Sequence, residues 1–496
     1  MADPSVDLLI DNARFVLTQN AGRNLLEGAS IAIRGDTIAA VGPASEIREK
    51  FSAGRTIDAS DRFVTPGLIN AHTHMESCYD KGLLDDVPAV PYCERKFSFT
   101  WGSLTAENYY YAALHTMLCC LKTGTTTIAD CGTIPTMEGS VVRAVRDIGI
   151  RGVLARELMD VHTATKSSYA SYDAFTQLCD RLQENTQECM ENSEAFIREH
   201  HMQADGRVRA ALDIQQVCNC SPDLCRGVKE LAERFDFGIQ SHVAVTHDMV
   251  EMTRKRYGMR DVEYLNHVGV LGPRIICAHM CWLDAGELIL MKETGAHVAH
   301  IPGASLHGIY SSVHHRSKIP ELVNLGVNVV LGNDESNTGT CHDMVREMYL
   351  VAGCHAEARG THVFPDENLF QIRSGATKAT VLDMATLNGA KGLLLEKEVG
   401  SIEAGKKADL VLWDLTSYEW VPTTRHNLIS NFIFNATGRS ARTVIVNGVP
   451  VIEDHRLTTL DEEEILHRVQ EFGEQIIPTA PWLAHPETWE LKWVKE

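Results

Sequence analysis

Between about residues 67 and 397, short apolar runs alternate with longer segments in which apolar residues recur every three or four positions. The short runs are typical of buried strands, and the longer segments are typical of helices with one apolar face. Repeated strand–helix alternation over this length predicts a (β/α)8 barrel, in which helices cover a closed parallel sheet. The strands expected are residues 126–130, 152–157, 208–213, 238–242, 274–279, 297–300 and 327–334, and the helices expected are residues 106–122, 141–148, 168–182 continuing to 201, 224–235 and 343–358.

The two ends of the chain share a different pattern, in which short strand-like segments are separated by turn residues. These segments are residues 6–10, 13–18, 29–33 and 37–41 near the start, and residues 408–413, 443–446 and 449–452 near the end. We therefore expect one small β-sandwich formed by both chain ends, from residues 1–66 and 398–470. The barrel then occupies residues 67–397, and residues 471–496 form a C-terminal extension.

Composition and charge argue against several classes of protein. The 496 residues are 44% hydrophobic and 23% charged, which is an ordinary globular balance. A formal net charge of −20 disfavours nucleic acid and anionic membrane surfaces, and no apolar run is long enough to span a membrane. The fourteen cysteines are too sparse for a disulfide scaffold and no signal peptide is visible, so we expect a cytoplasmic protein.

The segment 66–74, Pro-Gly-Leu-Ile-Asn-Ala-His-Thr-His, carries the first indication of chemistry. The apolar run 63–69 is interpreted as a buried strand that leads into His72 and His74. Residues two apart in a strand point to the same side, so the two imidazoles can face one metal ion. A histidine pair after a strand also occurs as surface or capping residues, so the pattern needs further ligands elsewhere in the chain.

Further polar side chains end the other predicted strands. In such barrels the functional groups lie at the carboxyl ends of the strands. Three histidines and one carboxylate suit a catalytic zinc, iron or cobalt ion with water completing the site, and such an ion makes hydroxide available near neutral pH. A carboxylate beside the ion is placed to take the proton from the water. The strand-end residues are Glu157, His242, His279, His300 and Asp334.

At these motifs the chain resembles the amidohydrolase superfamily over about residues 5–455. Its closest similarity is to the branch that holds triazine hydrolases, guanine-type and adenosine-type deaminases, and phenylurea and thiocarbamate hydrolases. The first-strand motif is segment 66–74, and segment 400–410 is similar to the return of the chain into the β-sandwich. The fifth, sixth and eighth strand ends are matched by Ser241-His242, Ala278-His279 and Gly332-Asn333-Asp334.

The resemblance implies one divalent metal ion per subunit, which we expect to be zinc, with iron or cobalt as alternatives. Asp334 would also accept the proton of the attacking water, and His279 would polarise the water or the substrate. A homo-oligomer, as a dimer, is expected from the resemblance together with the aromatic segment 92–101 and the tail 470–496. The implied metal ligands are His72, His74, His242 and Asp334.

The sequence departs from the deaminases of this branch at one informative position. Those enzymes have glutamate three residues after the fifth-strand histidine, where it transfers protons, and this chain has Val245. Proton delivery by His247, Glu335 or His279 remains open, although strand alternation predicts that Glu335 points away from Asp334. We also expect an ion pair between Arg156 and Glu157 and a single metal ion, because no strand ends in a bridging lysine.

These features favour a metal-dependent hydrolase that cleaves a C–N bond of a small-molecule substrate, which is an amide, urea, carbamate or substituted heterocycle. One alternative is an aminohydrolase of a purine-, pterin- or triazine-like ring, and another is a non-catalytic barrel used for binding. The sequence does not name the substrate. Four residues are candidates for contact with it, each with a structural alternative: Glu76, Trp101, His300 and His307.

Overall fold

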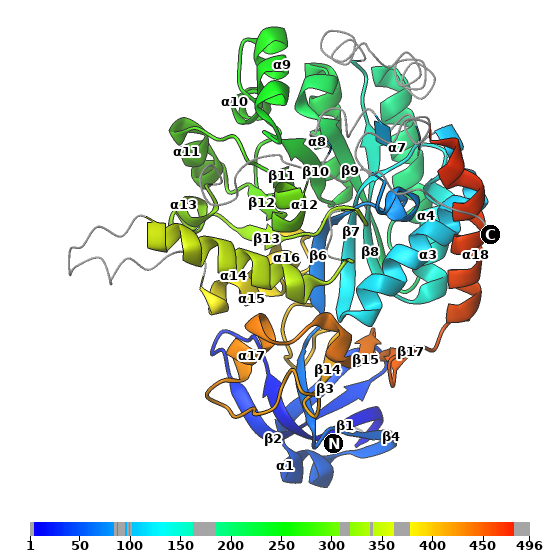
Figure 1. Cartoon of the computed structure of the whole chain (residues 1–496), viewed down its shortest axis with the longest axis vertical. Coiled ribbons are helices and arrows are strands. Elements are labelled where there is room, and N and C mark those ends of the chain that lie inside the picture. Colours follow the sequence, from blue (N-terminus) through cyan, green and yellow to red (C-terminus); the bar gives the residue numbers. More distant parts are fainter. Residues whose placement is uncertain are drawn as a thin grey trace, which may run out of the picture.

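The computed structural model describes residues 4–83, 87, 95–96, 99, 102–161, 184–307, 318–337, 341–361 (backbone alone for 356–361) and 377–480. Its larger part is a barrel with surrounding helices, and a smaller sheet lies at one end of the barrel (Figure 1). The helix expected at residues 168–182 and the candidate substrate residue Trp101 lie outside the described residues.

The larger part contains a sheet of eight parallel strands in the order β13 to β6. An isolated parallel bridge between Thr73 and Asp334 joins its two edges. This arrangement confirms the predicted (β/α)8 architecture. It also brings the first expected metal ligands, His72 and His74, close to the last one, Asp334. The strands are β6 Leu68–Thr73, β7 Thr125–Thr133, β8 Arg151–Leu158, β9 Val208–Gln216, β10 Ile239–Val243, β11 Ile275–His279, β12 His297–His300 and β13 Val329–Leu331.

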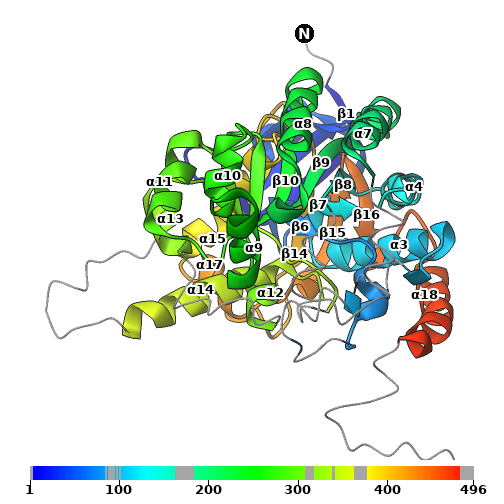
Figure 2. The ribbon, with the colours of Figure 1, turned by 90° about the horizontal axis from the view of Figure 1, so that it is seen from above.

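Helices surround these strands, as the view from above shows (Figure 2). Several begin at the capping residues that their sequences contain. For example, the Thr105 side chain accepts a hydrogen bond from the Asn108 amide before α3, and Ser221 caps α8 at the Leu224 amide. The helices are α3 Ala106–Lys122, α4 Glu138–Ile148, α7 Thr186–His200, α8 Pro222–Phe235, α9 His247–Tyr257, α10 Asp261–His267, α11 Ala285–Thr294, α12 Pro302–His307, α13 Ile319–Asn324, α14 Met344–Thr361, α15 Lys378–Met384 and α16 Leu387–Gly392.

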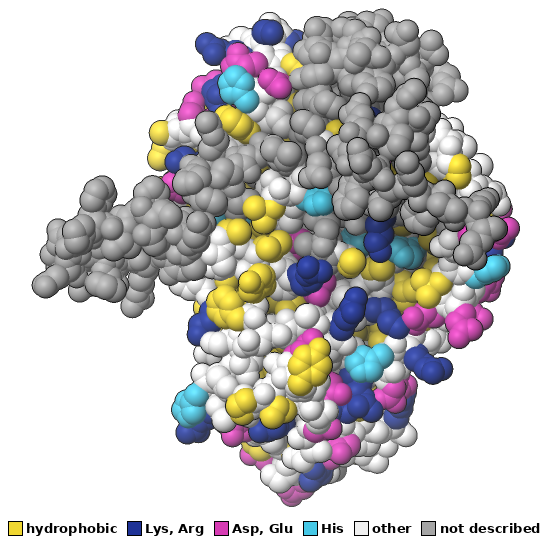
Figure 3. All heavy atoms as spheres, in the orientation of Figure 1, with side chains coloured by type: hydrophobic (Ala, Val, Ile, Leu, Met, Phe, Trp, Pro, Cys, Tyr) yellow, Lys and Arg dark blue, Asp and Glu magenta, His cyan; other side chains and the backbone are white. Residues whose placement is uncertain are grey.

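Both chain ends form the second, mainly antiparallel sheet of nine strands, as expected. The segments 6–10 and 13–18 are one strand with a register shift between Ile10 and Ala13. Acidic and basic side chains are interspersed over this part of the face in Figure 3, so the net charge of −20 does not gather there. The strands are β1 Ser5–Leu17, β2 Leu25–Arg34, β3 Thr37–Pro43, β4 Ser52–Asp58, β5 Arg62–Pro66, β14 Leu410–Asp414, β15 Ala441–Val446, β16 Val449–Glu453 and β17 Arg456–Leu457.

The described chain ends also contain α-helices. The helix α1 Ala44–Lys50 follows β3, and α17 Leu428–Phe434 lies between β14 and β15. The helix α18 Glu462–Ile476 follows the last strand and packs against α3 (Figure 1). The expected end of the sandwich at residue 470 therefore falls inside α18, and the domain boundaries as a whole stay a prediction.

The apolar run 63–69 is not the single strand that the sequence suggested. β5 ends at Pro66 in the small sheet, and β6 begins at Leu68 in the barrel. Gly67 lies between them, and a Cβ atom there would be only 2.0 Å from Thr126 Oγ1. Glycine at this position therefore lets the chain cross closely from one sheet to the other, and it sets where the following histidines lie.

Candidate metal centre

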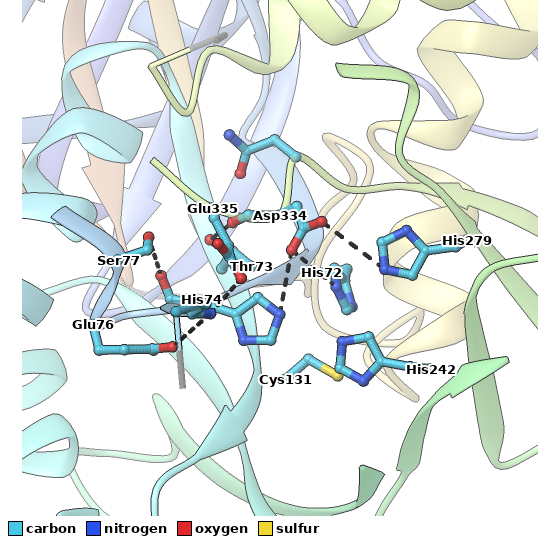
Figure 4. Close-up of polar contacts among 12 residues, drawn as sticks. His72, Thr73, His74, Glu76, Ser77, Cys131, His242, His279, Asp334 and Glu335 are labelled. Carbon is cyan, nitrogen blue, oxygen red and sulfur yellow. Dashed lines mark hydrogen bonds and ion pairs between the residues drawn. The ribbon is translucent and has the colours of Figure 1, made fainter. Parts of the chain in front are cut away.

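Four histidines and one aspartate converge at the carboxyl ends of the barrel strands (Figure 4). His72 and His74 come from the end of β6, His242 from β10, His279 from the end of β11, and Asp334 follows β13. The His72 ring centroid lies 5.2 Å from that of His74, 5.1 Å from that of His242 and 5.2 Å from that of His279. Asp334 Oδ1 is 3.3 Å from His74 Nε2 and 3.6 Å from His72 Nε2, and Asp334 Oδ2 is 3.9 Å from His279 Nε2.

Backbone contacts between β6 and the end of β13 hold this carboxylate in place. The amides of Asn333 and Asp334 both donate to the His72 carbonyl, at 3.1 and 3.0 Å, and the His74 amide donates to the Asp334 carbonyl at 3.2 Å. A Cβ atom on Gly332 would lie 2.7 Å from the Cβ of His72, so glycine permits this approach. Asp334 itself has a φ of +67°, a left-handed conformation that is uncommon for residues other than glycine, and its carboxylate lies toward the histidines.

The donor set fits a divalent cation. His72 is fully buried, and neither of its ring nitrogens makes a hydrogen bond to a described residue. His242 Nδ1 lies 2.7 Å from the Gln215 carbonyl, which leaves Nε2 for a ligand. The ligand atoms of His72, His74 and His242 all lie within 4.8 Å of one another, and so do those of His72, His279 and Asp334. Buried polar atoms without partners are costly, and a shared cation would satisfy them.

The charges of the cluster also suit metal binding. Burial lowers the pKa of His72 and of His242, and it lowers that of His279 to about 3, so these rings are neutral near pH 7. Burial also acts to lower the pKa of His74, but the Asp334 and Glu76 carboxylates outweigh it and raise the pKa to about 9. The neighbouring imidazoles outweigh burial at Asp334 and hold its pKa well below the usual value, so this carboxylate is ionised.

Lys96 forms an ion-pair cluster beside the histidines that sequence reasoning missed. Its ammonium lies 3.0 Å from Glu76 Oε1 and also pairs with Glu335, and all three side chains are buried. Contrary to the prediction that Glu335 points away, its carboxylate lies near His74 and Asp334, with ligand atoms within 4.8 Å. Strand alternation fails here because β13 ends at Leu331 and Asp334 has a positive φ.

The predicted Arg156–Glu157 ion pair is wrong. Arg156 binds Glu138 and Glu184 on the outside of β8, with distances of 3.0 and 2.6 Å. Glu157, the next residue in the strand, therefore faces the other side, toward the barrel interior. Because adjacent residues of a strand point in opposite directions, the charge of one could not neutralise the other.

Three further polar residues line the interior beside His242 and His74. Cys131 lies beside His242 (Figure 4). Its Sγ donates to Asp213 Oδ1 at 3.5 Å, and the ligand atoms of Cys131 and Asp213 lie within 4.8 Å of that of His242. Burial raises the pKa of Asp130 and of Asp213 to about 7. Both aspartates end predicted strands, at residues 126–130 and 208–213, so the strand-end rule could have found them.

The other candidate residues are placed as follows. His300 ends β12, is buried, and makes no hydrogen bond to a described residue through either ring nitrogen. His307 ends α12, while Glu76 is held by Lys96. His247, one of the proposed proton carriers, begins α9 and packs edge-on against Trp282, with ring centroids 5.4 Å apart.

Comparison with known proteins gives one family. A family model described as "Amidohydrolase family" matches residues 63–451. The chain is 30% identical over 474 residues to a 5-methylthioadenosine/S-adenosylhomocysteine deaminase of Thermoanaerobacter pseudethanolicus, covering 95% of this chain and 100% of the relative. It is also 30% identical over 447 residues to a 5'-deoxyadenosine deaminase of Methanobrevibacter smithii, covering 90% of this chain and 93% of the relative.

Solved structures support the same fold. An adenosine deaminase from Xanthomonas campestris with bound zinc superimposes with a TM-score of 0.83 at 23% identity, covering 96% of this chain and 99% of that one. An atrazine chlorohydrolase from Arthrobacter aurescens complexed with zinc gives 0.81 at 24% identity, covering 94% and 100%. No helix among the described residues is long and apolar enough to cross a membrane. The chain therefore belongs to the amidohydrolase family, as a hydrolase that acts on carbon–nitrogen bonds.

Proposed function

We propose that this chain removes an amino or substituted amino group by hydrolysis from a ring carbon of a nitrogen heterocycle. The observation that carries the proposal is the convergence of four histidines with Asp334, which gives a ligand set and a proton acceptor in one buried place. The deaminases that are about 30% identical over nearly the whole chain support a purine-like ring.

We infer that His72, His74, His242 and Asp334 hold one divalent ion, with zinc supported by the two neighbours that contain it. When bound, such an ion lowers the pKa of a coordinated water toward neutrality and polarises the reacting centre. The neutral imidazoles described above are the form that binds a metal. Of the three histidine ligands, His72 and His242 are already neutral near pH 7, whereas His74, with a pKa of about 9, gives up its proton when it takes up the ion.

Asp334 and His279 provide the proton transfer and charge stabilisation. Asp334 Oδ2 accepts a proton from the attacking water and later returns it to the leaving nitrogen. His279 is neutral near pH 7, so its ring N–H can donate a hydrogen bond to the oxygen or nitrogen on which negative charge develops. Both side chains are buried, which excludes bulk water from these steps.

A second candidate function is hydrolysis of an amide, urea or carbamate, and Val245 favours it. This side chain is buried in an apolar cluster with Ile301 and Ala304, so the position cannot transfer a proton to a ring nitrogen. An acyclic carbonyl substrate would not need that transfer. The two candidates differ in the product, because the first leaves an intact ring with an oxo or hydroxyl group in place of the amine, whereas the second splits an acyclic compound into an amine and an acid.

The experiment is a product assay on the metal-loaded protein. The panel contains 5'-methylthioadenosine, S-adenosylhomocysteine, 5'-deoxyadenosine, adenosine, an aminotriazine, a phenylurea and an aryl carbamate, with ammonia measured enzymatically and products by mass spectrometry. We expect ammonia or amine release from at least one heterocycle, and none with His242→Ala. Turnover confined to the urea or carbamate would support the second candidate, and no product from any compound would contradict both.

Finer properties are proposed as well. We propose that the enzyme is cytoplasmic and a homodimer that contains zinc in preference to iron or cobalt. The basis for the dimer is the family resemblance and the aromatic segment 92–101. Light scattering at micromolar concentration should give twice the chain mass of 54.9 kDa, and a monomer would contradict the assembly.

A further inference from the structure

Hydrolysis at a ring carbon needs a proton for the neighbouring ring nitrogen, and Val245 cannot supply it. When water attacks the carbon, an electron pair moves onto that nitrogen, which must be protonated and then deprotonated as the C–N bond to the leaving group breaks. The residue that does this must carry an exchangeable proton and lie beside the histidine cluster. The barrel interior contains several carboxyl groups that meet the second condition.

Four of those carboxyl groups already have partners. Glu76 and Glu335 bind the Lys96 ammonium. Asp130 accepts a hydrogen bond from Thr133 Oγ1 at 2.5 Å, and Asp213 accepts one from the Cys131 thiol at 3.5 Å. By contrast, the carboxyl group of Glu157, at the end of β8, accepts no hydrogen bond and forms no ion pair with any described residue. The Glu157 side chain is buried, with 5% of the residue exposed.

Glu157 lies beside the histidine cluster, on the side of His74. Its Oε2 and the His74 Nδ1 are both 3.6 Å from the point where a Cβ atom on Gly132 would be. The two groups are therefore at most twice that distance apart, across a glycine that adds no side chain between them. Gly132 has a φ of +109°, a conformation that favours glycine, so the backbone itself keeps a side chain out of the space between Glu157 and His74.

We propose that Glu157 contacts the substrate and exchanges the ring-nitrogen proton, in place of the glutamate that is absent at residue 245. Its carboxyl proton moves to the ring nitrogen as the water oxygen bonds to the carbon, while Asp334 takes the proton of the water. On collapse, the C–N bond to the leaving group breaks, that nitrogen takes the proton from Asp334, and the ring nitrogen returns its own to Glu157. Both carboxyl groups end as they began, with one water consumed.

The electrostatic environment keeps Glu157 in its proton-carrying form. Burial raises the pKa of its carboxyl group well above the usual value, and the carboxylates of Asp213, Glu76 and Asp130 add to this effect. The ammonium of Lys96 opposes it. Asp213 lies beside Glu157 on the neighbouring strand β9, in direct register with it.

The test is Glu157→Gln in the metal-loaded enzyme, with the best substrate from the panel. The amide keeps the size and can donate a hydrogen bond, but it cannot transfer a proton. We expect kcat to fall by about a hundredfold or more with little change in KM and an unchanged metal content. We also expect Glu157→Asp, which retains a carboxyl group, to recover part of kcat. The matched control is Glu138→Gln, which changes the glutamate of α4 that pairs with Arg156 on the outer side of β8 and should stay near wild type.

A second readout needs no substrate. The infrared difference spectrum between wild type and Glu157→Gln at pH 7 should show the carbonyl stretch of one protonated carboxyl group in the wild type. Absence of this band, a wild-type kcat in Glu157→Gln, or an equal loss in Glu138→Gln would overturn the role. The role rests on the proposed function, but a panel without product would contradict that function, whereas product formed equally fast by Glu157→Gln would contradict only the role of Glu157.

Discussion

Lys96→Met tests whether the buried ion-pair cluster supports the site. The Lys96 ammonium lies between Glu76 and Glu335, and the side chains are only 3%, 2% and 7% exposed. Removing one partner of a buried ion pair leaves the other charge without compensation, which typically costs about 3–5 kcal/mol. Here two carboxylates lose their common partner beside Asp334, so we expect the free energy of unfolding to fall by at least about 3 kcal/mol.

The assay is urea unfolding at pH 7.5, followed by circular dichroism, with wild type and variant prepared in parallel. Lys122→Met is the matched control, because its ammonium pairs with Glu462 at the surface, where the two side chains are 32% and 26% exposed. Exposed pairs contribute about 0–1 kcal/mol, so this variant should lose little. A loss below about 1 kcal/mol in Lys96→Met, or equal losses in both variants, would refute the reasoning.

Three other expected outcomes follow from the same geometry. Burial raises the pKa of Asp213 from 3.8 to about 7. The folded protein therefore retains a proton that the unfolded chain has lost, and its stability falls as the pH rises between these two values. In the metal-free protein, the stability of Asp213→Asn relative to wild type should increase by a few kcal/mol between pH 5 and pH 8 in urea unfolding, and a constant difference would contradict the shift. Gly332→Ala places a Cβ atom 2.7 Å from that of His72 and should weaken metal binding by about 10–100-fold in a chelator competition, whereas Gly353→Ala, with nothing within 4 Å, should not. His279→Ala should keep its metal but lose a factor of about 100–1,000 in kcat, and wild-type turnover would exclude its role in charge stabilisation.

Much of the architecture could be predicted from the sequence because local patterns were strong. The helix at residues 106–122 was expected with the bounds that the structure gives, since its apolar positions and its Thr105 cap agree. The strand ends were also placed well enough to bring His72, His242 and Asp334 into one list. That succeeded because all eight parallel strands end on the same side of a barrel, so sequence order alone predicts a common location.

What could not be predicted depends on single backbone angles and on contacts between distant segments. The direction of Glu335 was missed because the positive φ of Asp334 is not visible in a strand pattern. Lys96 was missed because its partners follow different strands, and nothing in the local sequence indicates that it returns to the site. The break in the run 63–69 was missed because the close approach of Gly67 to Thr126, which is far away in the sequence, cannot be seen in the local pattern.

The metal content of wild type and His242→Ala, measured by plasma mass spectrometry after extensive dialysis, tests the central claim most directly. Wild type should contain one divalent ion per chain. His242→Ala should contain almost none, because the variant lacks one of four ligands and leaves an incomplete site. Full metal occupancy in His242→Ala, or a wild type that hydrolyses its substrate at the same rate after complete metal removal, would contradict the account.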